Sequence, residues 1–217
     1  MVLTTAALLT LTACQGSGGD DPTPAPSSSA SPQQDGTSSR TVPPGFIECD
    51  GRPPKDGAPV ADVDLTAYTD QAPTGFVAAS GYSEDLPVEG DWVITAYEPI
   101  DQAHGLDVLG MVVYPQMDLG PLTVTCDEIS WEDLEARVDQ YDEIRGATTV
   151  ESRERTTVAG LPAVREVVKL PRYTYEGYWI FGRGQVAHAY CQWAVNETQI
   201  RQGCQEYLST LVFEEAS

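Results

Sequence analysis

Positive charge is scarce in this chain of 217 residues. Only 12 residues are Lys or Arg, against 33 Asp and Glu, so the formal net charge is −21. A surface with this excess of carboxylates repels phosphate backbones. The composition therefore argues against nucleic acid as a partner.

Histidine is rarer still, because the chain has only His104 and His188. A catalytic triad would need one of them beside a nucleophilic serine and an acid. The chain also lacks the Gly-x-Ser-x-Gly elbow that presents such a serine. We expect His104 in a turn and His188 as a hydrogen-bonded residue in the middle of a strand. The alternative is an envelope hydrolase that uses His188 with nearby acids.

Motifs for metals and cofactors are missing as well. The chain has five cysteines but no Cys-x-x-Cys pair, which disfavours both a zinc site and a dithiol redox centre. Asp62 and Asp64 match the start of a calcium loop, but the remaining ligands do not follow. Arg183 lies between two glycines without the Lys and Ser or Thr of a phosphate loop, which indicates a hairpin turn. We predict no metal and no cofactor.

No apolar run near the N-terminus is long enough to span a bilayer. Residues 1–13 are small and apolar, which is too short for a permanent membrane helix but suits a signal peptide. The run ends in Leu-Thr-Ala before Cys14, and this pattern resembles a bacterial lipobox. The resemblance implies cleavage before Cys14 and a lipid on that residue, which would anchor the protein at the outer side of the cell membrane.

One feature departs from the signal-peptide pattern. No Lys or Arg precedes the apolar run, although such segments begin with positive charge. We therefore expect the true start of the protein to lie upstream of Met1.

Residues 14–43 have the composition of a tether. After Cys14 they are rich in Ser, Pro, Gly and Asp and contain almost no apolar side chain. Such a segment cannot bury a core, so we predict a disordered linker between the lipidated cysteine and a folded domain. The membrane, reached through this anchor, is the first predicted partner.

Residues 44–217 have the composition of one globular domain. We expect strands over residues 91–100, 106–114 and 122–129, then a helix capped by Ser130 and ended by Gly146. Four more strands follow, over residues 148–158 and 164–170 and in a hairpin at 178–195, before a second helix over 196–211 with Asn196 as its cap. Residues 65–70 read as a short helix or an irregular segment. The order predicts an α+β domain with a mostly antiparallel sheet and two long helices.

The later part of the domain resembles a known family. The signature Val158-Ala159-Gly160-Leu161-Pro162-Ala163, the hairpins around it and the final helix are similar to the PsbP-like fold, which includes LpqN-type lipoproteins of actinobacteria. The resemblance covers roughly residues 91–213. It implies a non-enzymatic envelope domain that binds proteins or small molecules, and it supplies no catalytic residues.

Four cysteines fall inside the folded domain: Cys49, Cys126, Cys191 and Cys204. In an exported protein they predict two disulfides with three possible connectivities. We favour Cys191–Cys204, because a strand and the helix packed on it bring the two residues together. This choice leaves Cys49–Cys126 as the second bridge.

Aromatic residues crowd the last hairpin. Strand alternation places Tyr178 on one face of the sheet and Trp179 and Phe181 on the other. One helix covers only one face, so the other face needs a second cover or a partner. The first helix or residues 65–82 could supply that cover. If they do not, the face binds an envelope protein or a small apolar ligand, and the candidate binding residues are Tyr175, Tyr178, Trp179, Phe181 and Arg183.

Overall fold

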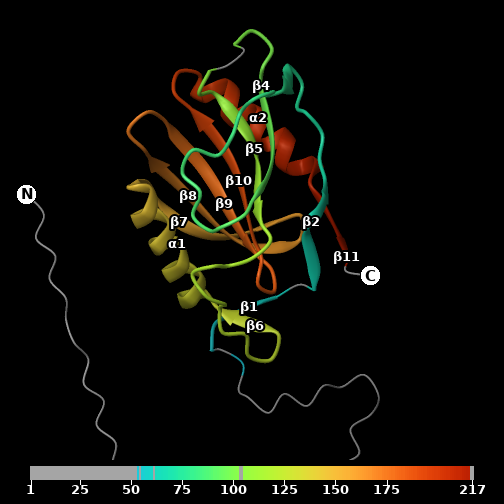
Figure 1. Cartoon of the computed structure of the whole chain (residues 1–217), viewed down its shortest axis with the longest axis vertical. Coiled ribbons are helices and arrows are strands. Elements are labelled where there is room, and N and C mark those ends of the chain that lie inside the picture. Colours follow the sequence, from blue (N-terminus) through green and yellow to red (C-terminus); the bar gives the residue numbers. More distant parts are fainter. Residues whose placement is uncertain (1–52, 54, 61, 103–104, 216–217) are drawn as a thin grey trace, which may run out of the picture. The chain divides into compact units, whose positions relative to one another are not determined.

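An antiparallel sheet of seven strands, in the order β3-β4-β5-β10-β9-β8-β7, forms the centre of the domain (Figure 1). The computed structural model describes residues 53, 55–60, 62–102 and 105–215. The predictions for Cys14, the signal peptide, the linker, Cys49 and His104 lie outside these residues.

Its strands are β3 (Phe76–Ala78), β4 (Val93–Pro99), β5 (Val108–Tyr114), β7 (Thr148–Val158), β8 (Leu161–Lys169), β9 (Thr174–Phe181) and β10 (Val186–Trp193). Two small sheets pair β1 (Gly57–Pro59) with β6 (Glu128–Ser130), and β2 (Val63–Thr69) with β11 (Val212–Glu215). The helices are α1 (Trp131–Arg145) and α2 (Glu197–Thr210). The structure thus confirms the predicted α+β class with a mostly antiparallel sheet and two long helices.

Helix α1 begins and ends where its sequence predicts. The side chain of Ser130 accepts a hydrogen bond from the backbone N–H of Asp133, which satisfies a free donor of the first turn. Gly146 ends the helix with a left-handed φ of 65°, a conformation that glycine adopts without steric cost.

The start of α2 is built differently from the prediction. Asn196 occupies the cap position, but its side chain makes no capping hydrogen bond to the helix. The buried carboxylate of Asp107 instead accepts the backbone N–H groups of Ala194, Val195 and Asn196 and the side-chain amide of Asn196. The residue just before β5 therefore fixes the turn from β10 into α2.

Two predicted elements differ from the structure. Residues 63–69 form strand β2, because they pair with β11, the segment that follows α2 at the end of the chain. Of the strand predicted at 122–129, only Glu128–Ser130 forms, as β6. Cys126 and Asp127 have positive φ values of 57° and 59° and make a tight turn instead, with Thr125 bridged to Glu128.

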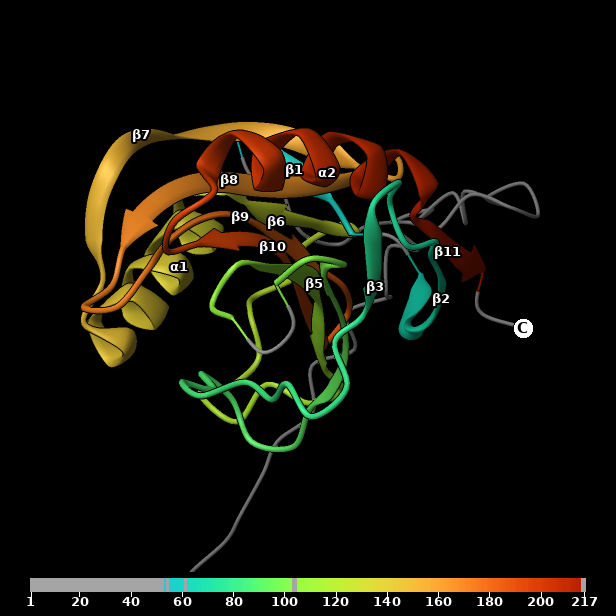
Figure 2. The same cartoon turned by 90° about the horizontal axis from the view of Figure 1, so that it is seen from above.

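The two helices cover opposite faces of the central sheet (Figure 2). On the α1 face, Leu134, Val138 and Tyr141 of the helix pack in one cluster with Trp179 and Phe181 of β9. On the α2 face, Ile200, Cys204 and Tyr207 of the helix pack in a second cluster with Ile180 and with Ala and Val side chains of β8 and β10. Both faces of the sheet are buried, so the sequences of the central strands β5 and β10 are almost entirely apolar.

Candidate functional site

The aromatic face of the last hairpin is covered in the structure. Tyr175, Trp179 and Phe181 are only 1%, 0% and 4% exposed, respectively. They lie beneath α1, whose Tyr141 ring centre is 4.7 Å from that of Trp179. Of the two alternatives, cover by the first helix is the one observed, so these three residues do not form an open binding face. The strand pattern could not show that α1 folds back over the sheet.

The other two candidates lie apart from that face. Arg183 is exposed in the β9–β10 turn and forms an ion pair with Asp127 at 2.7 Å. Tyr178 lies half-buried on the α2 face, where its hydroxyl donates to Glu176 Oε1 at 2.7 Å. The structure thus does not bring the five candidates together into one surface.

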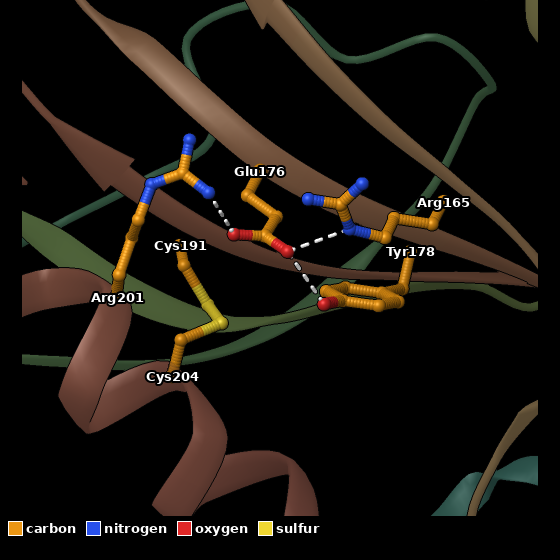
Figure 3. Close-up of a disulfide and its surroundings, with 6 residues drawn as sticks. All are labelled: Arg165, Glu176, Tyr178, Cys191, Arg201 and Cys204. Atoms are coloured by element: carbon orange, nitrogen blue, oxygen red, sulfur yellow. Dashed lines mark hydrogen bonds and ion pairs between the residues drawn. A yellow bond between two sulfur atoms is a disulfide. The ribbon is translucent and has the colours of Figure 1, made fainter. Parts of the chain in front are cut away.

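Glu176 is the centre of an ionic cluster beside α2 (Figure 3). Its carboxylate accepts hydrogen bonds from Arg165 Nε at 2.7 Å and from Arg201 Nη1 at 2.9 Å, in addition to the Tyr178 hydroxyl. The guanidinium of Arg201 also lies 4.8 Å from the ring centre of Trp193. Each of these groups has a partner inside the cluster. The ionic cluster therefore holds α2 against β9.

The predicted disulfide Cys191–Cys204 is confirmed next to this cluster (Figure 3). It joins β10 to α2 across a Cα–Cα distance of 5.7 Å, which is ordinary for a disulfide. The predicted partner of Cys126, Cys49, lies outside the described residues, so that pairing stays a prediction.

A second polar cluster is buried on the α1 face around His188. Its ring stacks on Trp179, with ring centres 3.7 Å apart and planes inclined by 5°, and it also touches the rings of Tyr175 and Tyr190. Its Nδ1 lies 3.5 Å from Arg145 Nη1, while Nε2 has no hydrogen-bond partner. The structure places His188 in a strand as predicted, but leaves its ring only partly hydrogen-bonded.

Arg145 enters this cluster from the last turn of α1. Its Nη1 donates to the hydroxyl of Tyr175 at 3.2 Å, and its guanidinium lies 4.8 Å from the centre of that ring. The carboxylate that forms an ion pair with Arg145 is Glu84, whose Oε1 lies 3.7 Å from Arg145 Nη2. This distance is too long for a hydrogen bond, and Nε has no partner. A buried guanidinium is thus paired only loosely.

The charges in this cluster are few and well defined. Burial lowers the pKa of His188 well below its ordinary value, and the nearby charge of Arg145 lowers it further. Burial also raises the pKa of Tyr175 and Tyr190 well above the ordinary value, so these phenols stay neutral. Burial opposes the charge of Arg145, but its neighbours, among them the carboxylate of Glu84, keep its pKa above the ordinary value. Arg145 is thus the cation of the cluster. Its carboxylates are Glu84, beside Arg145, and buried Glu166, which accepts hydrogen bonds from the Tyr175 hydroxyl at 2.9 Å and from Trp179 Nε1 at 2.8 Å.

Glu84 belongs to the connection between β3 and β4, residues 79–92, which we call the strap. Figures 1 and 2 show the strap on the same side of the sheet as α1. Three of its carboxylates pair with arginines of the underlying structure: Glu84 with Arg145, Asp85 with Arg172, and Glu89 with Arg137. The strap is thus attached to the structure beneath it through three ion pairs, of which the Glu84–Arg145 pair reaches the His188 cluster.

A third group of charges lies between α1 and the outer strands. Arg153 forms ion pairs with Asp139 at 2.5 Å, Asp142 at 2.7 Å and Glu166 at 3.1 Å. Burial raises the pKa of Asp142 to about 6, and the neighbouring charge of Glu166 adds to the effect. One guanidinium is thus shared by three carboxylates.

The contacts of His188 do not favour hydrolysis. Among the described residues its recorded side-chain neighbours are Trp179, Tyr175, Tyr190 and Arg145, none of which is a serine or a carboxylate. It is also 1% exposed and neutral. The alternative of a hydrolase built on His188 therefore has no support from this geometry.

Sequence reasoning missed Arg145 and Glu84. Arg145 continues the buried stripe of Leu134, Val138 and Tyr141 at helical spacing, and this was the available signal. The sequence gave no signal for Glu84, because its partner Arg145 lies far away along the chain.

No protein-family model and no curated protein matches this chain. Among solved structures, the chain is similar to the solution structure of PsbP (CyanoP) from the cyanobacterium Synechocystis sp. PCC 6803. The TM-score is 0.42 at 11% sequence identity, over 78% of this chain and 99% of the other. A likeness of this degree concerns the arrangement of elements, and no activity or partner is transferred from it.

Within the part of the chain that the structure describes, neither helix has the length and apolar character needed to cross a bilayer. Over the same residues, no group of three or more His, Cys, Asp and Glu side chains is placed to hold a metal ion.

Proposed function

We propose that this chain is a lipid-anchored envelope protein of the LpqN type, whose domain binds a small ligand without catalysing a reaction. The proposed ligand site is the cluster of Arg145, His188, Tyr175 and Tyr190 beneath the strap. The observation that carries the proposal is the buried guanidinium of Arg145, whose ion pair with Glu84 spans 3.7 Å and whose Nε has no hydrogen-bond partner.

Unpaired polar atoms of this kind are expensive. A buried donor without a partner costs about 1–3 kcal/mol, and native interiors satisfy nearly all such groups. Here Arg145 Nε and His188 Nε2 lack a hydrogen-bond partner in one small region of the α1 face. Binding of a polar ligand would satisfy these groups, and that gain favours a ligand site over a purely structural core.

The anchor is the second part of the proposal. A lipid on Cys14 and the linker that follows would hold the domain at the outer face of the cell membrane. The apolar segment before Cys14 and the acidic, Ser- and Pro-rich linker support this arrangement.

An envelope protein remains the second candidate ligand, with one supporting observation. Every arginine of the described residues lies within 3.7 Å of a carboxylate, so the unpaired surface charge is almost entirely negative. A protein partner would therefore present a basic surface.

Native mass spectrometry of the full-length protein, released from membranes in mild detergent, tests the proposal. We expect a small-molecule adduct on the wild type that is lost in Arg145→Met. The matched control is Arg183→Met, which removes an exposed arginine and should keep the adduct. Equal adducts in both variants, or none on the wild type, would contradict the ligand site. The same spectra report acyl chains on Cys14, and an unmodified cysteine in the membrane fraction would contradict the anchor.

A further inference from the structure

We infer that Asp142, Arg153 and Glu166 form a pH-sensitive contact, which we call the latch, between the end of α1 and the central sheet. A proton on Asp142 strengthens the latch, and loss of that proton weakens it. The end of α1 would then stay packed in acid and open more often at neutral pH. The inference goes beyond the proposed function, because it concerns the docking of α1 and requires no ligand.

Three carboxylates share one cation at the latch. Arg153 forms ion pairs with Asp139, Asp142 and Glu166, and like charges held this close repel most strongly where water is excluded. The side chain of Asp139 is 72% exposed, so solvent screens its charge, whereas that of Glu166 is fully buried. The repulsion therefore acts chiefly between Asp142 and Glu166. The charged and titratable groups around Asp142 are Asp139 and Arg145 of α1, Arg153 of β7, Glu166 of β8 and Tyr175 of β9.

One oxygen of Asp142 is placed to carry the proton. Its Oδ2 accepts a hydrogen bond from Arg153 Nη2 at 2.7 Å, but its Oδ1 is buried and has no hydrogen-bond partner among the described residues. A charged oxygen in that position has neither water nor a donor to stabilise it. A proton on Oδ1 removes the charge and leaves the bond between Oδ2 and Arg153 in place. Burial and the charge of Glu166 raise the pKa of Asp142 to about 6, in agreement with this placement.

Glu166 is the fixed side of the latch. Its Oε1 accepts hydrogen bonds from the Tyr175 hydroxyl at 2.9 Å and from Trp179 Nε1 at 2.8 Å. Its Oε2 accepts a hydrogen bond from Arg153 Nε at 3.1 Å. All three donors belong to strands of the central sheet, so they hold this carboxylate in place. Asp142 instead lies near the end of α1, and helix ends open more easily than the strands of a core. The end of α1 is therefore the part that responds to the repulsion.

Hydrogen exchange of the full-length protein at pH 5 and at pH 7.5 tests the inference. Protection factors, which correct for the intrinsic pH dependence of exchange, are compared for the amides of residues 141–145, with residues 200–207 of α2 as the reference. A pKa of about 6 in the closed state, against about 4 in the open state, should make the end of α1 about tenfold better protected at pH 5. Asp142→Asn cannot exchange this proton and should abolish the difference. Glu143→Gln is the matched control, because it removes an exposed carboxylate from the same turn and should keep the difference.

An NMR titration supplies the second readout. The carboxyl carbon of Asp142 should titrate with a midpoint near pH 6, and the indole N–H of Trp179, which donates to Glu166, should shift over the same range. Glu166→Gln removes the neighbouring charge and keeps an acceptor for the indole, so the Asp142 midpoint should move down. A wild-type midpoint near the ordinary value of about 4, equal protection at both pH values, or loss of the difference in Glu143→Gln would overturn the inference. The wild-type measurements alone decide the matter if a variant fails to fold.

Discussion

His188 of β10 lies flat on Trp179 of β9, with the ring centres 3.7 Å apart. The two residues are directly opposite in the antiparallel register, so the stack is built into the pairing of the strands. Two residues earlier on β9, Gly177 provides the space for the imidazole. A Cβ at that position would lie 2.4 Å from His188 Nε2 and 2.6 Å from Tyr175 Cε2.

Gly177→Ala should therefore destabilise the domain by about 2 kcal/mol, the usual cost of overpacking a core. Chemical denaturation of the variant and the wild type measures the change. His188→Ala in the same background should recover part of the loss, because it removes the group that the new methyl meets. Strictly additive losses in the double variant would show that the clash is not with His188.

Asp107→Ala should weaken the connection between β10 and α2. The carboxylate accepts three backbone N–H groups there, and hydrogen bonds to a charged group are worth more than neutral ones, so we expect a loss of about 3 kcal/mol. Asp64→Ala is the control, since Asp64 bonds Thr66 at an exposed position and should change little. Hydrogen exchange should speed up at Ala194 to Asn196 in the first variant alone, and equal protection would contradict the role of Asp107.

The same carboxylate makes a prediction about pH. Burial by itself would raise the pKa of Asp107, but the hydrogen bonds from Ala194, Val195 and Asn196 outweigh it and hold the pKa below its ordinary value. The folded state thus favours the ionised form, and this stability is fully present above about pH 4, the ordinary pKa. It is lost as the pH falls further, through the lowered pKa of the folded state. Acid unfolding of Asp107→Ala should be less steep in that range than that of the wild type.

Asp142 should have the opposite effect on pH dependence. Burial, with the charge of Glu166, raises its pKa to about 6, so the folded state favours the protonated form. Its contribution is present at low pH and is lost as the pH rises from about 4 to about 6, by roughly 2 kcal/mol. Asp142→Asn should therefore gain stability relative to the wild type between pH 5 and pH 7.5, as measured by thermal unfolding at each pH. A constant difference between the two proteins would rule out a raised pKa.

Loss of the disulfide should be measurable without loss of the fold. The bridge closes a loop with a sequence separation of 13, and a closure of this length contributes roughly 3 kcal/mol. The double variant Cys191→Ala, Cys204→Ala should unfold at lower denaturant by that amount under oxidising conditions. A change below about 1 kcal/mol would mean that the packing of α2 on β10 supplies nearly all of the stability at this contact.

The sequence was sufficient for features that depend on neighbouring residues. Ser130 and Gly146 mark both ends of α1 because capping acts within one turn. Alternation along β9 assigned Trp179 and Tyr178 to opposite faces, since that rule follows from the pleat of a single strand. The pair Cys191 and Cys204 was also predictable, because the strand and the helix that carry them are adjacent in the chain.

Contacts between distant segments were decided only by the tertiary structure. Strand β2 forms because it pairs with β11 at the other end of the domain, and its own residues do not favour a strand clearly. Asp107, and not Asn196, fixes the start of α2, although 89 positions separate the two residues.

The candidate site, too, could not be predicted from the sequence, because it is built by contacts between distant segments. The sequence alone established an acidic chain with a strand-rich α+β domain, an aromatic hairpin and a short apolar segment before Cys14. Only the folded chain shows that α1 closes over Trp179 and that the strap brings Glu84 toward Arg145. Burial and ion pairing depend on which surfaces meet in space, and local periodicity does not record which distant segment will cover a face.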